Sequence, residues 1–463
     1  MSSSVLNETF KRTLKVTNNF DKIAESELVE NYQLNKTDIE LLSNGMNKNS
    51  LKILNEVLYK RFYNNSNYDD LDIEGKNYYY NLVQISKLQL DTEIDSNTKD
   101  KFEKIFKRSI DSRGFNYFKR FRVALYEHLD EIKFSKEELY ILALAQFVVA
   151  EMLFLMTVKF NKNYERKVAH YTNIDVSRFL IHKKTKFRLS STEKMNDPSE
   201  GKLLFDYLGL KLEEGYKPLL TFLSCFTLNH NSLNHFRLYG KTDNIDCSGV
   251  SLVVDENFFH KYAVNSVKIN NVKKDNRLSL YRCSYIDINT GYFELSKRSK
   301  FSFFQEHHNL KVEDIEEIWS KYIKLTANTE KSLRTSMQDL KGLCEFANIK
   351  GFAIDELLKI ISQPLKFLFK HFSFQEEQEC RMIYVCELND DIVNHDYEKN
   401  LTYINYDQDM VDSLTNIYVG TASEKILTPL SIEVSKVSEK IKVKLLEAPF
   451  RVEKELIKLN KID

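Results

Sequence analysis

The chain has 463 residues, which is too long for one small core and predicts two or three domains. It is 42% hydrophobic and 29% charged, a composition typical of a globular protein. Its 67 basic and 67 acidic residues cancel, which removes any whole-chain argument for nucleic-acid binding and leaves open only a local basic face.

The first 160 residues contain few helix breakers, because all five prolines and most of the twelve glycines lie farther along the chain. This pattern predicts an all-helical domain at residues 1–160, with a regulatory or partner-binding role. The opening segment, MSSSVLNETFKRTLK, lacks the apolar stretch of a secretory signal, which favours a cytoplasmic protein.

One segment of this domain has nearly the length needed to span a bilayer: residues 139–158, LYILALAQFVVAEMLFLMTV. Glu151 would cost about 2.5 kcal/mol or more inside the hydrocarbon. Ser135 and Glu138 also form the capping pattern of a soluble helix. A core helix is therefore predicted, and no membrane partner.

From residue 162 onward, short runs of β-branched and aromatic residues predict strands. These runs are KVAHYTN, KFRLSS, PLLTFLSCF, GVSLVVD, RLSLYRCSYI, CRMIYVCEL, LTYINY, TNIYVG and KVKLLEA. Helical patterns separate only some of them, the longest at about residues 310–372. Residues 161–463 are therefore predicted to form an α+β domain with a mixed sheet, interrupted by a helical insertion at about 310–372.

Polar residues at the ends of two predicted strands are candidates for ligand binding. His170 offers ring nitrogens to a ligand hydroxyl, and Tyr171 offers an aromatic face to a flat ring. Ser224 lies near the end of PLLTFLSCF, and Tyr239 follows it in HFRLYG. A half-buried strand end with a satisfied histidine explains the same residues without a ligand.

The run FQEEQECRMIYVCEL carries charge into an apolar strand. If the whole run is extended, Glu377, Glu379 and Arg381 share one face, because side chains alternate along a strand. Buried charges need partners, and Arg381 can pair with Glu379. The run therefore predicts either a structural ion pair or a rigid carboxylate that faces a cleft.

Several common sites have no anchor in this sequence. The glycines do not form a dinucleotide-binding or phosphate-binding loop, and there is no GxSxG or HExxH. The six cysteines contain no CxxC pair, so reduced thiols without zinc are expected.

Together these blocks resemble a bacterial family defined only as a domain of unknown function, number twenty-nine seventy-one. The resemblance covers about residues 165–450. The blocks that carry it are His170-Tyr171-Thr172, Asn196-Asp197-Pro198-Ser199-Glu200, Ser224-Cys225-Phe226, Tyr239-Gly240 and Glu377-Gln378-Glu379-Cys380-Arg381. The family often has Trp before its Tyr-Ala segment, whereas this chain has His235-Phe236.

The order of the blocks is also similar to the layout of ADP-ribosyltransferases, which implies NAD as a substrate and no metal. In that layout Glu379 stabilises the positive charge that develops as the nicotinamide–ribose bond breaks, and Glu377 orients or deprotonates the acceptor. The remaining roles fall to a group of cofactor-binding candidates: His170, Tyr171, Thr172, Ser224, Tyr239 and Arg381.

Two alternatives stay open. In a metal-dependent nuclease, Asp197, Glu200, Glu377 and Glu379 would bind Mg²⁺, although Asp197 also suits the cap of a helix that begins at Pro198. In a binding module, the charged run is structural and the helical half recognises a protein partner. If the protein is a transferase, its arrangement suggests a toxin or an antiphage-defence effector whose acceptor is an unknown protein or nucleic acid.

Overall fold

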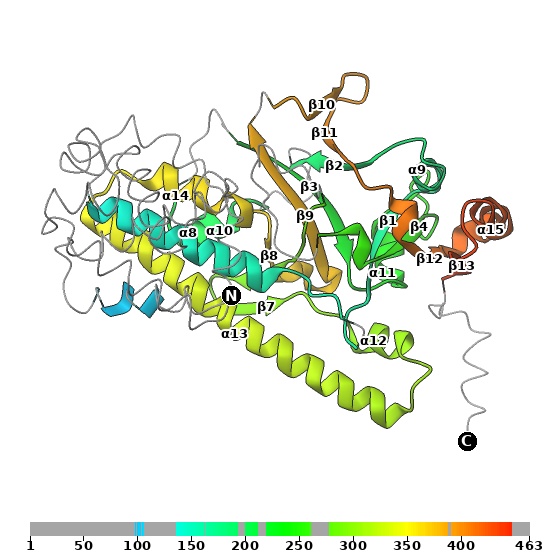
Figure 1. Ribbon diagram of the computed structural model, residues 1–463, viewed down its shortest axis with the longest axis horizontal. Helices are drawn as coiled ribbons and strands as arrows, with labels where there is room; N and C mark the ends of the chain where they lie inside the picture. The colour runs from blue at the N-terminus through cyan, green and yellow to red at the C-terminus, as the bar shows by residue number, and fades with distance from the viewer. Residues whose placement is uncertain are drawn as a thin grey trace, which may run out of the picture.

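The structure is a computed structural model that describes residues 98, 100–102, 104–105, 136–161, 163–192, 200–211, 219–260, 277–387 and 390–446. The predicted all-helical domain therefore lies largely outside the described residues. Its last helix, α8 (Lys136–Met156), is described. The described part has helices and two mixed sheets, which confirms the predicted α+β class (Figure 1).

The larger sheet has ten strands and the smaller has three. The larger sheet contains β1 (Lys167–Thr172), β2 (Phe187–Ser191), β3 (Leu219–Thr227), β4 (Val250–Asp255), β5 (Leu280–Arg282), β9 (Glu379–Glu387), β10 (Val393–Asp396), β11 (Leu401–Tyr406), β12 (Leu414–Val419) and β13 (Lys442–Leu445). The smaller contains β6 (Ser284–Asp287), β7 (Tyr292–Leu295) and β8 (Phe369–His371). The predicted strand RLSLYRCSYI is thus two strands, β5 and β6, which belong to different sheets.

The large sheet branches at β3. Its main order is β10-β11-β2-β3-β1-β4-β12-β13, and β9 pairs with β3 and carries β5 on its other side. The β9 strand runs antiparallel to β3 along all nine residues of β3. Because a strand has only two edges, β1 and β2 must share the other edge of β3.

The helices from α8 onward are α8, α9 (Ile174–Ile181), α10 (Leu203–Leu208), α11 (Leu233–Leu238), α12 (Lys300–Glu306), α13 (Val312–Lys350), α14 (Asp355–Ser362) and α15 (Leu427–Ser435). Short 3₁₀ turns follow several elements: Glu256–Phe258, Gln363–Leu365, Phe372–Glu377, Met410–Ser413 and Thr421–Ile426. The segment 310–372 is mostly helical, as predicted, but it ends in the strand β8. Gly351, with φ 69°, ends α13, and Pro364 lies in the turn after α14.

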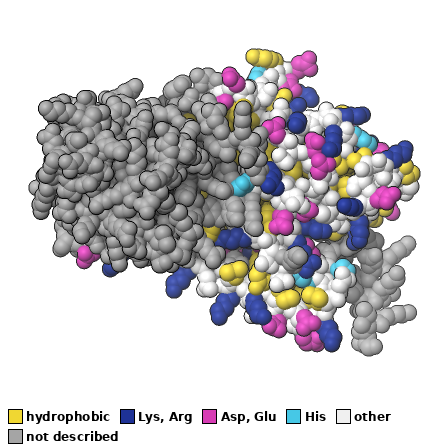
Figure 2. Space-filling model, in the orientation of Figure 1, with side chains coloured by type: hydrophobic (Ala, Val, Ile, Leu, Met, Phe, Trp, Pro, Cys, Tyr) yellow, Lys and Arg dark blue, Asp and Glu magenta, His cyan; other side chains and the backbone are white. Residues whose placement is uncertain are grey.

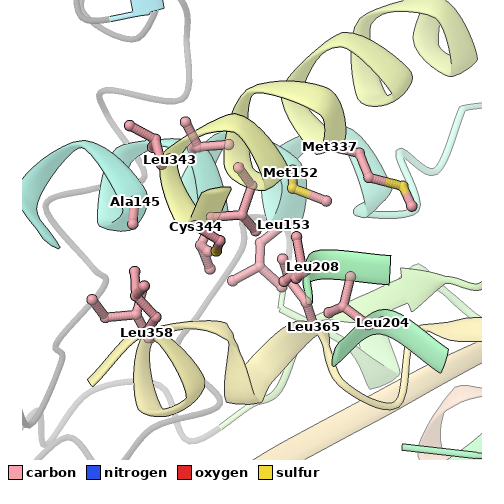
Figure 3. Close-up of a cluster of buried hydrophobic side chains, with 14 of the residues drawn as sticks. Ala145, Met152, Leu153, Leu204, Leu208, Met337, Leu343, Cys344, Leu358 and Leu365 are labelled. Atoms are coloured by element: carbon pink, nitrogen blue, oxygen red, sulfur yellow. The ribbon is translucent and has the colours of Figure 1, made fainter. Parts of the chain in front are cut away.

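One helical layer covers one face of the sheet at β3 and β9. The helices α8, α10, α13 and α14 share a core, whose centre is drawn in Figure 3, and it extends to Leu223, Ile383 and Val385 on the strands. The α8 helix lies beside α13 (Figure 1). Glu151 is buried on α8 and accepts a hydrogen bond from the Ser336 hydroxyl at 3.0 Å, so this segment is a core helix. Within the described residues, no helix is long and apolar enough to cross a membrane.

The opposite face of the large sheet forms a second core with α9, α15 and an aromatic group around Phe226 and Phe258. On the surface in Figure 2, basic and acidic side chains are interspersed over the described part of the chain. This mixed pattern agrees with the zero net charge of the sequence.

Candidate functional site

A cavity of about 560 Å³ lies where the large sheet branches. Its wall takes residues from β1, β2, β3, β8, β9 and α11, and from the start of β11. The predicted residues that contribute to it are His170, Tyr171, Ser224, Tyr239, Glu377, Glu379 and Arg381. Segments distant in the sequence thus converge on one cavity. Thr172 is not among the residues that line this cavity.

The branch in the sheet lets the cavity reach both faces of β3. On the edge opposite β9, β3 pairs with β2 at Leu223 and with β1 at Thr227. Between these points the Cys225 carbonyl accepts a hydrogen bond from the His170 ring at 2.8 Å. Ser224 points to the opposite face from Cys225, because successive side chains alternate along a strand. Both residues nevertheless line the cavity.

Arg381 holds Glu379 through two hydrogen bonds. Its Nε donates to Oε1 at 2.9 Å and its Nη2 donates to Oε2 at 3.0 Å. The guanidinium is also fixed by the Phe367 carbonyl at 2.7 Å and by Glu200 at 2.8 Å. Glu379 and Arg381 are both buried, so the carboxylate has one defined orientation.

Lys370, which the sequence patterns did not single out, lies at the centre of a buried charge cluster. Its ammonium donates to Glu379 Oε2 at 2.7 Å, to Glu377 Oε2, and lies 3.2 Å from Glu200 Oε1. We use "charge cluster" for Glu200, Lys370, Glu377, Glu379 and Arg381. The missed signal was Phe369-Lys370-His371, whose residues form the short strand β8 at the end of the predicted helical insertion.

The cluster keeps its charges fixed. Burial opposes ionisation of Glu379, but Arg381 and Lys370 outweigh it and lower the pKa of this carboxyl well below its usual range. Burial likewise opposes the charged form of Lys370, while Glu379, Glu377 and Glu200 raise its pKa above the usual value. An ionised carboxylate therefore faces the cavity at neutral pH.

Glu377 is not part of the strand, and this corrects the predicted alternation. It ends a 3₁₀ turn, Gln378 adopts a left-handed conformation with φ 45°, and β9 begins only at Glu379. The turn is held because the Glu377 carbonyl accepts hydrogen bonds from His235 Nε2 at 2.8 Å and from the Thr227 hydroxyl at 2.9 Å. The Glu377 carboxylate nevertheless reaches the same cavity as Glu379.

Tyr239 donates a hydrogen bond from its hydroxyl to Glu377 Oε1. Burial and the adjacent Glu377 raise the pKa of Tyr239 above its usual value, so the hydroxyl stays protonated and remains a donor. The two oxygens of Glu377 are thus engaged by Tyr239 and Lys370. Gly240 follows Tyr239 with φ +69°, and a Cβ there would lie 2.5 Å from the Thr172 carbonyl oxygen. The close approach of the Thr172 carbonyl therefore explains why a glycine follows Tyr239.

His170 lines the cavity and keeps one ring nitrogen as an acceptor. A carbonyl can only accept, so the bond to Cys225 places the proton of neutral His170 on Nδ1 and leaves a lone pair on Nε2. Burial lowers the pKa of His170, which favours this neutral form. Its ring packs edge-on against Phe187, with centroids 5.1 Å apart. A ligand hydroxyl is a suitable partner for Nε2.

Tyr171 has a structural task. Its hydroxyl donates to the Asn229 carbonyl at 2.9 Å and accepts from the Ser232 amide at 3.0 Å. Its ring stacks on His235, with centroids 5.1 Å apart. These contacts join β1 to α11 and leave Tyr239 as the aromatic candidate whose hydroxyl contacts the charge cluster.

Two further observations concern the metal-site alternative. Within the described residues, no group of three or more His, Cys, Asp or Glu could hold a metal ion. Asp197 lies outside the described residues, whereas Glu200 is described and belongs to the charge cluster.

No protein-family model, curated protein or solved structure matches this chain, so the resemblances drawn from its motifs stay predictions.

Proposed function

We propose that the cavity cleaves the nicotinamide–ribose bond of NAD and transfers ADP-ribose to an acceptor, as the resemblance to ADP-ribosyltransferases implies. One observation carries the proposal: a carboxylate with a lowered pKa, Glu379, is held rigidly in the wall of a cavity that His170 and Ser224 also line. These three residues come from β9, β1 and β3.

The charge of the wall suits the bond cleavage. As the bond breaks, its electron pair leaves with the nicotinamide nitrogen, and positive charge develops on the ribose carbon. The charge cluster has three carboxylates and two cations, a formal excess of one negative charge. A fixed negative charge in a buried site stabilises the developing positive charge more strongly than water does.

The acceptor step requires a base, and Glu377 is suitably placed. The nucleophile of the acceptor forms a bond to the ribose carbon and loses a proton to the Glu377 carboxylate. Lys370 and Tyr239 hold that carboxylate through its two oxygens. The proton would therefore displace one of these two donors.

The remaining lining residues suit the substrate. The free Nε2 of His170 accepts a hydrogen bond from a ribose hydroxyl. Ser224 helps to position the ribose, and it lies on the same face of the sheet as the aromatic group around Phe226. Tyr239 provides an aromatic ring for nicotinamide. Arg188 lies in the cavity wall, and its guanidinium carbon is 4.0 Å from the centre of the Tyr403 ring. Its positive charge suits the pyrophosphate.

The same contacts favour a transferase over a nuclease. Each carboxylate of the charge cluster already pairs with Lys370 or Arg381, and these cations compete with a metal ion for the same oxygens. A structural ion pair would lower the pKa of Glu379 in the same way, so the release assay below separates the binding module from the transferase. A toxin or defence role, in which residues 1–160 sense a signal or restrain the activity, remains part of the proposal and rests on domain arrangement.

The test is release of nicotinamide. The purified full-length protein is incubated with NAD, with and without a bacterial lysate, and free nicotinamide is measured by chromatography. Glu379→Gln should reduce release about 100-fold or more, because it removes the charge but keeps the size of the side chain. Glu433→Gln is the matched control, since Glu433 pairs with Arg178 at the surface on α15 and does not line the cavity.

The outcomes separate the proposed functions. No release from the wild-type protein under either condition would remove the transferase assignment, as would equal release by Glu379→Gln. Nucleic-acid cleavage that requires Mg²⁺ and is lost in Asp197→Asn would favour the nuclease.

A further inference from the structure

One carboxylate oxygen of the charge cluster has no donor among the described residues: Glu200 Oε2. The other five oxygens are engaged. Glu379 bonds to Arg381 and Lys370, Glu377 bonds to Tyr239 and Lys370, and Glu200 Oε1 lies 2.8 Å from Arg381 Nη2. Among the described residues, Glu200 Oε2 is therefore the one carboxylate oxygen of the charge cluster without a donor.

This oxygen is buried, and it belongs to a residue of the cavity wall. The Glu200 side chain is only 4% exposed, and Glu200 lines the cavity wall. Folding removes such an oxygen from water without giving it a partner, which destabilises the ligand-free protein. Buried polar atoms in folded proteins are nearly always satisfied, so an orphan in a cavity wall indicates a ligand that supplies the missing donor.

The charge of the cluster indicates which chemical group of a ligand would bind at this oxygen. An ionised carboxylate oxygen can only accept a hydrogen bond, so the ligand must donate. The cluster also has one formal negative charge in excess, and a positively charged donor would balance it. A hydroxyl satisfies the first requirement alone, whereas an N–H group on a cation satisfies both.

We propose that Glu200 Oε2 is the recognition point for a positively charged N–H donor group of the ligand. Two sources share this chemistry: a guanidinium or ammonium on the acceptor, and the carboxamide N–H on the cationic nicotinamide ring of NAD. The inference goes beyond the proposed reaction, because it concerns binding and holds whether or not the bound ligand reacts.

Glu200→Gln is a sharp test because of what it preserves. The amide oxygen can still accept the hydrogen bond from Arg381, while the amide nitrogen replaces the free acceptor with a donor. A binding role predicts weaker binding with an unchanged or higher Tm, since the hydrogen bond from Arg381 is kept and the one excess negative charge of the cluster is removed. A purely structural role predicts a lower Tm with unchanged binding.

The experiment measures binding of two probes by calorimetry, each beside a counterpart in which the tested group is uncharged. Agmatine represents the guanidinium source and is compared with 4-aminobutylurea, while NAD is compared with NADH, whose nicotinamide ring is neutral. Two variants serve as controls. Glu165→Gln alters a buried carboxylate outside the cavity that binds Arg282 and accepts from the Tyr322 hydroxyl at 2.5 Å, so it should lower Tm. Glu433→Gln alters a partly exposed one.

The expected result is that agmatine or NAD binds the wild-type protein, and that Glu200→Gln weakens this binding about tenfold or more while the controls do not. Loss of agmatine binding assigns the acceptor as the source, and loss of NAD binding assigns the nicotinamide end. Equal binding by Glu200→Gln, equal binding of the uncharged counterparts, no binding of either probe, or a Tm loss like that of Glu165→Gln would each overturn the inference. Nicotinamide release by the wild-type protein alongside any of these would leave the proposed function standing.

Discussion

Arg381 and Glu379 lie two residues apart on one strand and form a bidentate ion pair inside the protein, with N–O distances of 2.9 and 3.0 Å. Strand alternation places both side chains on one face, where they meet Cys225 and Thr227 of the neighbouring strand. Arg381 therefore determines the orientation of the carboxylate on which the proposed chemistry depends.

Removal of Arg381 alone should be strongly destabilising. Arg381→Met leaves Glu379 buried with only Lys370 as a cationic partner, and breaking a buried pair in this way costs about 3–5 kcal/mol. The double variant Arg381→Met/Glu379→Leu should recover most of the loss, because neither charge is then left uncompensated. Urea unfolding of the single and double variants checks both values. If the double variant is as unstable as the single one, the pair is not the cause.

The stability of the protein should depend on Glu379 at low pH. Its folded pKa lies below the unfolded value of about 4.3, so the unfolded chain binds the proton more readily. The contribution is therefore complete above about pH 5 and is lost as the pH falls toward the folded pKa. Urea unfolding from pH 3 to pH 8 should show that the stability difference between wild-type and Glu379→Gln protein is constant above pH 5 and shrinks below it. A difference that stays constant down to pH 3 would contradict the lowered pKa.

Much of the β-rich half could be predicted from local patterns. The strand cores around Ala169, Leu223 and Ile383 are apolar, β-branched or aromatic, and the structure has strands there. The pairing of Arg381 with Glu379 also follows from alternation and from the cost of burying charge. These features depend on neighbours in the sequence, which a single sequence reveals.

The rest depends on contacts between distant segments. Lys370 lies in a three-residue strand whose only described pairing is with β6, and Glu377 reaches the cavity from a turn held by His235 and Thr227. Neither the short strand nor the left-handed Gln378 has a strong local signal. The free oxygen of Glu200 emerges only when every partner of the charge cluster is known.

Gly240 should resist substitution more than another glycine with a similar backbone. A Cβ at Gly240 would lie 2.5 Å from the Thr172 carbonyl, whereas a Cβ at Gly291, which has φ +71°, would meet nothing within 4 Å. Gly291→Ala should therefore cost only the backbone strain, about 1 kcal/mol. Gly240→Ala should cost clearly more and should lower nicotinamide release, because Tyr239, the proposed aromatic contact of nicotinamide, would move. Urea unfolding and the release assay compare the two variants, and equal costs would contradict the close approach to Thr172.

Glu377 and Glu379 should affect different steps of the proposed reaction. Glu379 stabilises the charge formed as nicotinamide leaves, whereas Glu377 accepts the proton of the acceptor. Glu377→Gln should therefore reduce transfer of ADP-ribose to a lysate acceptor about 100-fold while reducing release of nicotinamide to water much less. Labelled NAD allows both quantities to be measured in one reaction, with Glu433→Gln as the control. An equal loss of transfer and release in Glu377→Gln would show that Glu377 acts before the nicotinamide leaves, because a base for the acceptor alone cannot slow the cleavage step.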